Sequence, residues 1–200
     1  MKILVVGGNG TIGKVVTNYF AKDNVVLVAG RNSGDVQLNI TDSESIKQAL
    51  ESIGKLDAIV CIAGEAKWSE FDNLTESDYY IGLKSKLMGQ VNLVRIGQHY
   101  LNPNGSITLS TGILADRPVP KTTSAAMVNG GIHSFVKAVA IEIKNGIRVN
   151  AVSLGLVEDA YDKYKDYFPG HVPVSMKTVI KAYCDSILGN ANGEIIRYYK

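Results

Sequence analysis

The sequence predicts an α/β fold, in which helices flank a doubly wound parallel sheet within a single domain over residues 1–200. Three observations support this prediction. Short apolar runs alternate along the whole chain with segments of helical periodicity. Glycines at positions 7, 10 and 13 separate the first apolar run from the first helical segment. A chain of 200 residues also buries enough surface to need no disulfide or metal.

The first two elements are a strand at residues 2–6 and a helix over residues 12–20, joined by a glycine-rich turn. Glycine lets the backbone turn tightly and approach a ligand, and the start of a helix presents free N–H groups and a positive dipole end. We therefore expect the turn to hold the diphosphate of a dinucleotide, with a ligand-free turn as the alternative. The residues expected to line it are Gly7, Asn9, Gly10, Thr11, Ile12 and Gly13.

The second strand, at residues 25–29, bears on the identity of the nucleotide. In a dinucleotide-binding fold the end of this strand lies beside the adenosine ribose, where an acidic residue binds the 2′-hydroxyl of NAD. This chain has Arg31 there instead, with Ser33 nearby. A guanidinium group suits a 2′-phosphate through its charge and its forked donors. We therefore predict NADP(H) as the cofactor; a solvated loop arginine is the alternative.

The remaining elements follow from the same patterns. Strands are expected at residues 36–38, 56–62, 106–110, 147–153 and 194–198, helices at residues 43–53, 75–100, 124–144 and 175–188, and a turn at residues 102–105. Gly82, Gly89 and Gly97 fall on one face of the first long helix, which predicts close packing there. The aromatic segment at residues 158–173 is expected either to cover a substrate site or to dock on the core.

Ligands bind open α/β sheets at the carboxyl ends of the strands. Ala63 and Gly64 follow the fourth expected strand, and Thr111 stands at the end of the fifth. We therefore expect these residues to face the cofactor or the substrate.

Composition excludes several classes of function. The net charge is +2 and the basic residues are scattered, which argues against nucleic acid or membrane partners. Cys61 and Cys184 are expected in the core, and His99, His133 and His171 share no ligand spacing, so we expect no metal site and interpret the histidines as ordinary surface or packing residues. No apolar run approaches the ~20 residues that span a bilayer, and we expect a cytoplasmic protein.

The chain resembles the short-chain dehydrogenase/reductase family over essentially its whole length. The first turn has the G-x-x-G-x-x-G spacing of atypical members, and residues 61–64 (C-I-A-G) stand where the family has N-N-A-G. Asn39 occupies the position of an aspartate beside the adenine. Residues 146–153 (G-I-R-V-N-A-V-S) are very similar to the family's segment before the loop of its sixth strand.

The resemblance implies a Rossmann-like NAD(P)-binding domain that moves a hydride between nicotinamide and a carbonyl or alcohol carbon of a small molecule. The family's active-site serine falls on Thr111, or on Ser110 if the register slips by one, and its asparagine falls on Lys86. The family's tyrosine and lysine fall on Ala125 and Asn129, so the Tyr-x-x-x-Lys signature is absent.

A rebuilt proton path is one reading of this substitution. Lys86 is then the candidate acid, because burial lowers the pKa of a lysine. Thr111 is expected to hold the substrate oxygen, and Asn129 to hydrogen-bond the nicotinamide ribose. The nicotinamide side of the cofactor is expected at Ala63, Gly64, Leu156 and Val157.

The alternative function is an NADP(H)-binding sensor or partner-binding module without turnover. Lys86 is then a plain lysine on a wet helix face, and Asn129 bonds local backbone. By resemblance, the helices at residues 75–100 and 124–144 pair with a second copy of the chain, which predicts a homodimer or homotetramer.

Overall fold

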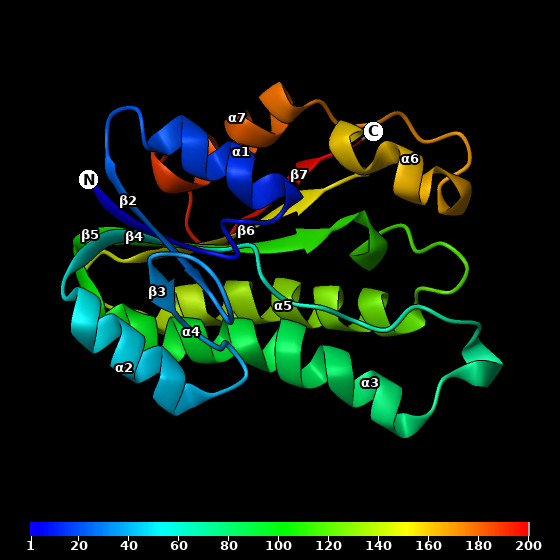
Figure 1. The fold of residues 1–200 in the computed structure, drawn as a ribbon, viewed down its shortest axis with the longest axis horizontal. Helices are drawn as coiled ribbons and strands as arrows, with labels where there is room; N and C mark the ends of the chain where they lie inside the picture. Colours follow the sequence, from blue (N-terminus) through cyan, green and yellow to red (C-terminus); the bar gives the residue numbers. More distant parts are fainter. Residues whose placement is uncertain (200) are drawn as a thin grey trace.

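Strand β1 (Lys2–Val6) lies inside a seven-stranded sheet in the computed structural model, which describes residues 1–199. The strand order is β3-β2-β1-β4-β5-β6-β7, and every neighbouring pair is parallel. Ile3, Leu4 and Val5 are fully buried because helices cover both faces of the sheet (Figure 1). The predicted doubly wound parallel sheet is confirmed.

Most elements begin and end within two residues of the expected positions. The other strands are β2 (Val25–Gly30), β3 (Val36–Gln37), β4 (Leu56–Cys61), β5 (Leu101–Gly112), β6 (Arg148–Leu154) and β7 (Ile195–Tyr198). The α-helices are α1 (Thr11–Phe20), α2 (Ser43–Ile53), α3 (Glu76–Gly82), α4 (Gly89–Gly97), α5 (Thr123–Glu142), α6 (Tyr161–Tyr164) and α7 (Met176–Ile187). Short helical turns are η1 (Phe71–Asn73), η2 (Leu83–Met88), η3 (Gln98–Tyr100), η4 (Ile113–Ala115), η5 (Glu158–Ala160) and η6 (Lys165–Tyr167).

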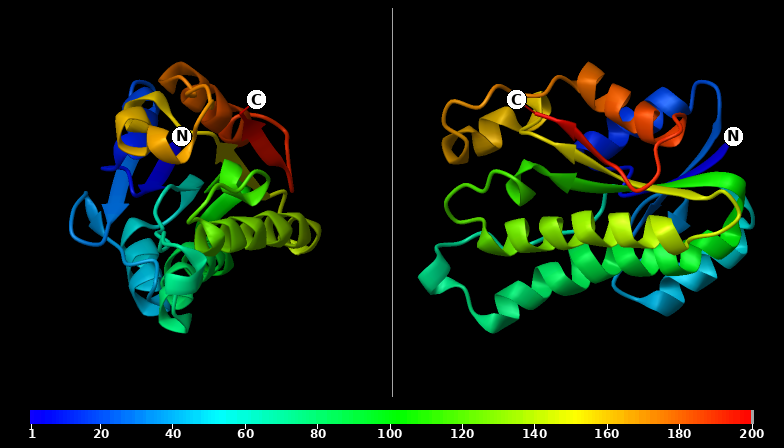
Figure 2. Two further views of the ribbon diagram at one scale, coloured as in Figure 1. Left: turned by 90° about the vertical axis from the view of Figure 1, so that its right-hand side faces the viewer. Right: turned by 180° about the vertical axis from the view of Figure 1, so that it is seen from behind.

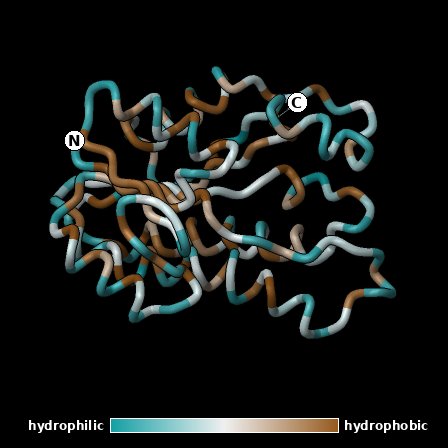
Figure 3. Tube along the Cα trace, in the orientation of Figure 1, coloured by the Kyte–Doolittle hydropathy of each residue, from teal (hydrophilic) through white to brown (hydrophobic). Residues whose placement is uncertain are grey.

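Helices α1 and α7 cover one face of the sheet, and α2, α4 and α5 cover the other (Figures 1 and 2). Each layer closes its own apolar core. Val16, Phe20 and Tyr183 belong to the first core, whereas Ile46 and Leu93 belong to the second. Figure 3 shows the strands as the apolar centre between the two layers. This sandwich leaves only the ends of the strands open to ligands.

The order of the strands reverses between β1 and β4. Strands β2 and β3 lie on one side of β1, and β4 to β7 lie on the other. The connections that leave β1 and β4 start side by side, because the N–H groups of Ile62 and Ala63 donate to the oxygen of Val6 at 2.8 and 3.2 Å. Open α/β sheets bind ligands at such a switch point.

The long helix expected at residues 75–100 contains a π-helical turn, η2, between α3 and α4. Such turns are rare in proteins, and those that do occur often lie at functional sites. Cβ atoms at Gly82, Gly89 and Gly97 would lie within 3.2 Å of side chains in α5, in the segment after β3 and in β4. The glycine face therefore packs within this chain, beneath the sheet.

The turn predicted at residues 102–105 is wrong, because these residues belong to β5. Asn104 has a φ of 64°, and the register between β4 and β5 shifts between Leu56 and Ala58. The Asn-Pro-Asn-Gly composition marks an irregularity inside the strand, of the kind that a bulge produces.

Candidate active site

Three adjoining cavities follow the carboxyl ends of the strands. The Arg31 cavity, of about 270 Å³, lies beyond β2 and β3. The glycine-turn cavity, of about 510 Å³, faces the turn between β1 and α1. The Lys86 cavity, of about 370 Å³, lies beyond β5 and β6. Gly64 lines all three, so the cavities adjoin one another, and we call the three together the trough.

The glycine turn has the shape of an anion cradle. Gly7 has a φ of 86°, and a Cβ there would lie 2.9 Å from the nitrogen of Ala63. A Cβ at Gly13 would overlap the oxygen of Gly7 and lie 2.7 Å from the Cα of Gly8, so α1 starts directly against the turn. Gly10 caps α1 without a side-chain bond, and no acidic residue lies in the first turn. The first N–H groups of α1 therefore suit a diphosphate.

The residues predicted for the diphosphate lie around this cradle. Five of them line the glycine-turn cavity: Gly7, Asn9, Gly10, Thr11 and Ile12. Gly13 is buried beneath the cavity, where it sets the closeness of α1 to the turn. Gly13 therefore supports the turn from below and does not line the cavity.

Arg31 and Ser33 lie at different cavities of the trough. Arg31 is exposed and lines the Arg31 cavity together with Asn39. Within residues 1–199, its guanidinium makes no ion pair or hydrogen bond that would neutralise or occupy it. Ser33 lines the glycine-turn cavity, and its hydroxyl accepts a hydrogen bond of 3.0 Å from the amide of Asn9. A free cation thus stands at the β2 end of the trough.

The residues predicted for the nicotinamide side lie where the cavities join. Ala63 lines the Arg31 and glycine-turn cavities, and Val157 lines the glycine-turn and Lys86 cavities. Leu156 lines the Lys86 cavity. These side chains are apolar and suit the flat faces of a bound group.

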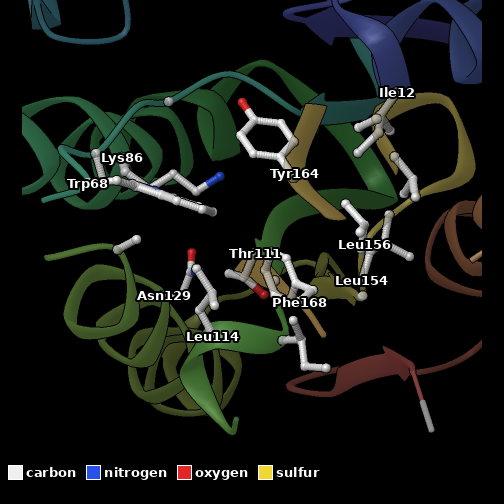
Figure 4. Close-up of a pocket in the computed structure, with 18 of the residues that line it drawn as sticks. Ile12, Trp68, Lys86, Thr111, Leu114, Asn129, Leu154, Leu156, Tyr164 and Phe168 are labelled. Carbon is white, nitrogen blue, oxygen red and sulfur yellow. The ribbon is translucent and has the colours of Figure 1, made fainter. Parts of the chain in front are cut away.

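Lys86 reaches the cavity from the π-helical turn η2 (Figure 4). Its stem crosses the backbone of Gly64, where a Cβ would lie 2.7 Å from the Cδ of Lys86. Burial lowers the pKa of Lys86 from its ordinary value. Within the described part of the chain, its ammonium has no ion-pair partner. Lys86 therefore lies in the site and not on a wet helix face.

The hydroxyl of Thr111 faces the Lys86 cavity at the end of β5. Its Oγ1 lies 2.9 Å from Nε2 of His133 on α5. The hydroxyl of Ser110 points to the other side of the sheet, 2.6 Å from the hydroxyl of the buried Tyr183. Thr111 is thus the hydroxyl that the structure presents to a substrate, and Ser110 belongs to the core.

His133 contacts Thr111 and belongs to a polar network with Asp116 and Arg197. The interpretation of His133 as an ordinary surface or packing residue did not include this network. Burial lowers the pKa of His133, against the opposing effect of Asp116. Arg197 lies 2.8 Å from Asp116, which also accepts a hydrogen bond from Tyr199, and these bonds lower the pKa of Asp116 to about 2. The sequence signal for this was the spacing of four residues between Asn129 and His133, which places both side chains on one face of α5.

Ala125 and Asn129 lie one turn apart on α5 and both line the Lys86 cavity. The methyl group of Ala125 offers no proton at this wall. The Asn129 side chain is nearly buried and makes no hydrogen bond to the other described residues, so its amide is available to a ligand.

Comparison with known proteins identifies the family of the chain. A family model of the short-chain alcohol dehydrogenase type, described as enoyl-(acyl carrier protein) reductase, matches residues 14–174. The chain belongs to the short-chain dehydrogenase/reductase family. The predicted family membership is confirmed.

Similar curated proteins of the short-chain dehydrogenase/reductase family include several reductases. The 3-oxoacyl-[acyl-carrier-protein] reductase FabG of Thermotoga maritima is 28% identical over 180 residues, which cover 78% of this chain and 73% of that protein. Elsinochrome reductase 1 of Elsinoe fawcettii is 29% identical over 78% of this chain and 64% of that protein. This chain thus spans about two thirds of the length of some relatives.

Solved structures that cover the whole chain are also similar to it. The protein lin1944 from Listeria innocua is 43% identical, with a TM-score of 0.97 and 100% of both chains covered. A small-chain dehydrogenase in complex with NADPH is 28% identical, with a TM-score of 0.87 and 96% of that chain covered.

In this member of the short-chain dehydrogenase/reductase family, aromatic side chains close the Lys86 cavity. Trp68 comes from the connection after β4, and Tyr164 and Phe168 come from the segment after β6 (Figure 4). The rings of Trp68 and Tyr164 have centroids 5.5 Å apart, and those of Trp68 and Phe168 are 6.4 Å apart. The segment at residues 158–173 therefore contributes to the site. Trp68 was missed, because nothing near it in the sequence marks its partners.

Other kinds of site are not found in the described residues. Over residues 1–199, no cluster of three or more His, Cys, Asp or Glu side chains is placed to bind a metal ion. No helix in the same range is both long and apolar enough to cross a bilayer.

Proposed function

We propose that the protein is an NADP(H)-dependent oxidoreductase of this family that transfers a hydride to or from a carbonyl or alcohol carbon of a small molecule. The observation that carries the proposal is the trough of three adjoining cavities. It passes from the free cation of Arg31, over the open start of α1, to the Lys86 cavity. A cation, an anion cradle and a largely apolar pocket suit a 2′-phosphate, a diphosphate and a nicotinamide with its substrate.

The residues present fit the cofactor. The cradle needs glycine at positions 7 and 13, because a Cβ there would collide with backbone. Arg31 would bind the 2′-phosphate, Ala63 and Gly64 would lie along the nicotinamide-side ribose, and Asn129 would hydrogen-bond that ribose. When bound, the cofactor supplies or accepts the hydride. An NADPH complex of a solved structure at 28% identity supports the choice of cofactor.

Two side chains are placed to handle the substrate oxygen. Thr111 would hold it by a hydrogen bond, since His133 fixes the position of the hydroxyl. Lys86 would exchange the proton at its Nζ, because its lowered pKa makes the ammonium a better acid near neutral pH. This assignment replaces the tyrosine and lysine that the family carries where this chain has Ala125 and Asn129.

The test is turnover by the purified protein. NADPH is mixed with aldehydes, ketones and quinones, and the absorbance of the reduced nicotinamide is followed. We expect turnover, with kcat lowered by about 10² to 10⁴-fold in Lys86→Met, the range that general acid catalysis contributes. Thr111→Val should also lower kcat. Lys84→Met is the matched control, because Lys84 is an exposed lysine on the same helical turn.

The same assay tests the alternative of a sensor without turnover, which no feature of the site favours. Tight NADPH binding with no turnover across the panel would support the sensor. No binding of NADPH at millimolar concentration, measured by nicotinamide fluorescence, would overturn both functions.

A further inference from the structure

The walls of the Lys86 cavity are apolar and partly aromatic. Trp68, Tyr164 and Phe168 line the cavity together with Leu114 and Leu156 (Figure 4). The ring of Tyr167 packs edge-on against Trp68 from behind, at 5.4 Å between centroids, so the aromatic wall is supported from outside. Aromatic side chains favour offset or edge contacts with another ring. The walls therefore favour a flat ring as ligand.

The same cavity holds the amine of Lys86, and no described residue supplies it with a counter-charge. No aspartate or glutamate lines it, and Glu65 lines the Arg31 cavity instead. Cys61 lies next to Lys86 but stays a neutral thiol, because burial raises its pKa to about 11. Burial lowers the pKa of His133 and so favours its neutral form, and its charged neighbours Asp116 and Arg197 pair with each other. An unpaired ammonium in an apolar cavity gains much from an anionic ligand.

Beside Lys86, the wall around Thr111 adds no second acid for a basic product. Reduction of a simple ketone leaves an alkoxide, which is strongly basic and needs a positioned acid. Ala125 offers no proton, and the hydroxyl of Thr111 is already bonded to His133. An oxyanion that is conjugated with an aromatic ring is a much weaker base, since its charge is delocalised. A nearby cation is sufficient to stabilise such an anion.

We propose that the Lys86 cavity binds a flat aromatic ring that carries an ionised oxygen, with the oxygen on Lys86 and the ring against Trp68 and Phe168. If the proposed function holds, the substrate of the enzyme is a quinone-type ring, and this part of the inference rests on that function. Reduction of such a ring adds one hydride from NADPH, which becomes NADP⁺, and leaves a phenolate-type anion that then takes one proton from water or from Lys86.

The test measures binding without turnover. The probe is 4-nitrophenol, whose ionised form is coloured, and occupancy is followed by quenching of Trp68, the one tryptophan of the chain. We expect the bound probe to ionise at a pH at least one unit lower than the free probe, which corresponds to at least tenfold tighter binding of the phenolate than of the phenol. The neutral ring of 4-nitroanisole should bind no better than the neutral phenol.

Matched variants assign the effect to Lys86. In Lys86→Met the downward shift should disappear, whereas Lys86→Arg, which keeps the charge, and Lys84→Met should retain it. Circular dichroism and NADPH binding show whether each variant is folded. An unshifted or raised pKa of the bound phenol, no binding of the probe, or an equal shift in folded Lys86→Met would overturn the inference.

Two results separate this inference from the proposed function. If NADPH binds and ketones are reduced but the phenolate is not preferred, the inference fails alone. If the phenolate is preferred but NADPH does not bind, the ring site stands and the proposed function fails.

Discussion

Gly64 lies at the junction of all three cavities and carries the stem of Lys86 across its backbone. It has a φ of 125°, a backbone conformation that residues other than glycine rarely adopt. A Cβ at this position would also lie 3.0 Å from the Cα of Lys86, so the helical turn itself must move. The residue after β4 therefore controls the position of the candidate acid.

Gly64→Ala should displace Lys86 and lower kcat. The matched control is Gly54→Ala, since Gly54 also has a positive φ, of 75°, but a Cβ there meets no atom within 4 Å. Each variant should lose about 1 to 3 kcal/mol of unfolding free energy from backbone strain, measured in urea, and Gly64→Ala should lose more than Gly54→Ala because its Cβ also meets Lys86. Only Gly64→Ala should also lose turnover; equal turnover in the two variants would contradict the account.

Arg31 is the residue to which we assign the choice of nucleotide. Arg31→Asp should weaken NADPH binding by about 10- to 100-fold, because a hydrogen-bonded charge contact is lost and a repulsion is added. NADH lacks the 2′-phosphate, so its affinity serves as the internal control and should change little. Fluorescence titration with both nucleotides measures the two constants. Equal losses for NADPH and NADH would remove the 2′-phosphate role of Arg31.

At the scale of elements, the strands and most helices are readable from the sequence because each has a clear period. β1 and β4 are mostly apolar runs, and α2 and α7 start at polar caps, Asp42 and Ser175. The Asn-Pro-Asn-Gly segment misleads because its composition suits a turn, while its pairing with β4 depends on residues 45 positions earlier.

The site was less readable than the fold, because its contacts join distant segments. The π-helical turn that carries Lys86 has no marker in composition. The bond between Thr111 and His133 requires α5 to pack across the end of β5. Trp68 meets Phe168 a hundred residues later. The cofactor residues were easier to place, since glycines and Arg31 directly follow the strands that position them.

Asp116 ties the connection after β5 to the C-terminal strand through Arg197 and Tyr199. The folded pKa of Asp116 is about 2, against an ordinary value of 3.8. The stabilisation is therefore fully present above about pH 4 and is lost as the pH falls from 3.8 toward 2. Because the pair is partly exposed, Asp116→Asn should remove only about 0.5 to 1 kcal/mol of unfolding free energy at pH 6.

Urea unfolding at pH 6 and at pH 2 checks this prediction. The difference between wild type and Asp116→Asn should shrink at pH 2. Asp162→Asn is the control, because the side chain of Asp162, which pairs with Lys165, is 96% exposed. A difference that stays the same at both pH values would show that the carboxylate charge has no part in stability.

At the scale of the whole molecule, helices α3 to α5 form one outer layer (Figure 2). The chain exposes Tyr80, Ile81, Met88, Met127 and Ile141 on these helices and on the π-helical turn between them. The glycines of this layer face inward, so pairing with a second copy would use the exposed side chains. We expect a homodimer or homotetramer in solution, measured by light scattering, and a smaller species for Met88→Glu. A monomeric wild type would contradict this expectation.

The central claim is that one trough holds NADP(H) from Arg31 to the Lys86 cavity. A crystal structure of the protein soaked with NADPH tests it most directly. The account predicts the 2′-phosphate at Arg31, the diphosphate at the start of α1, and the nicotinamide between Gly64 and Thr111, with its C4 facing the space below Lys86. A trough closed by side chains, or a nucleotide bound elsewhere on the molecule, would contradict it.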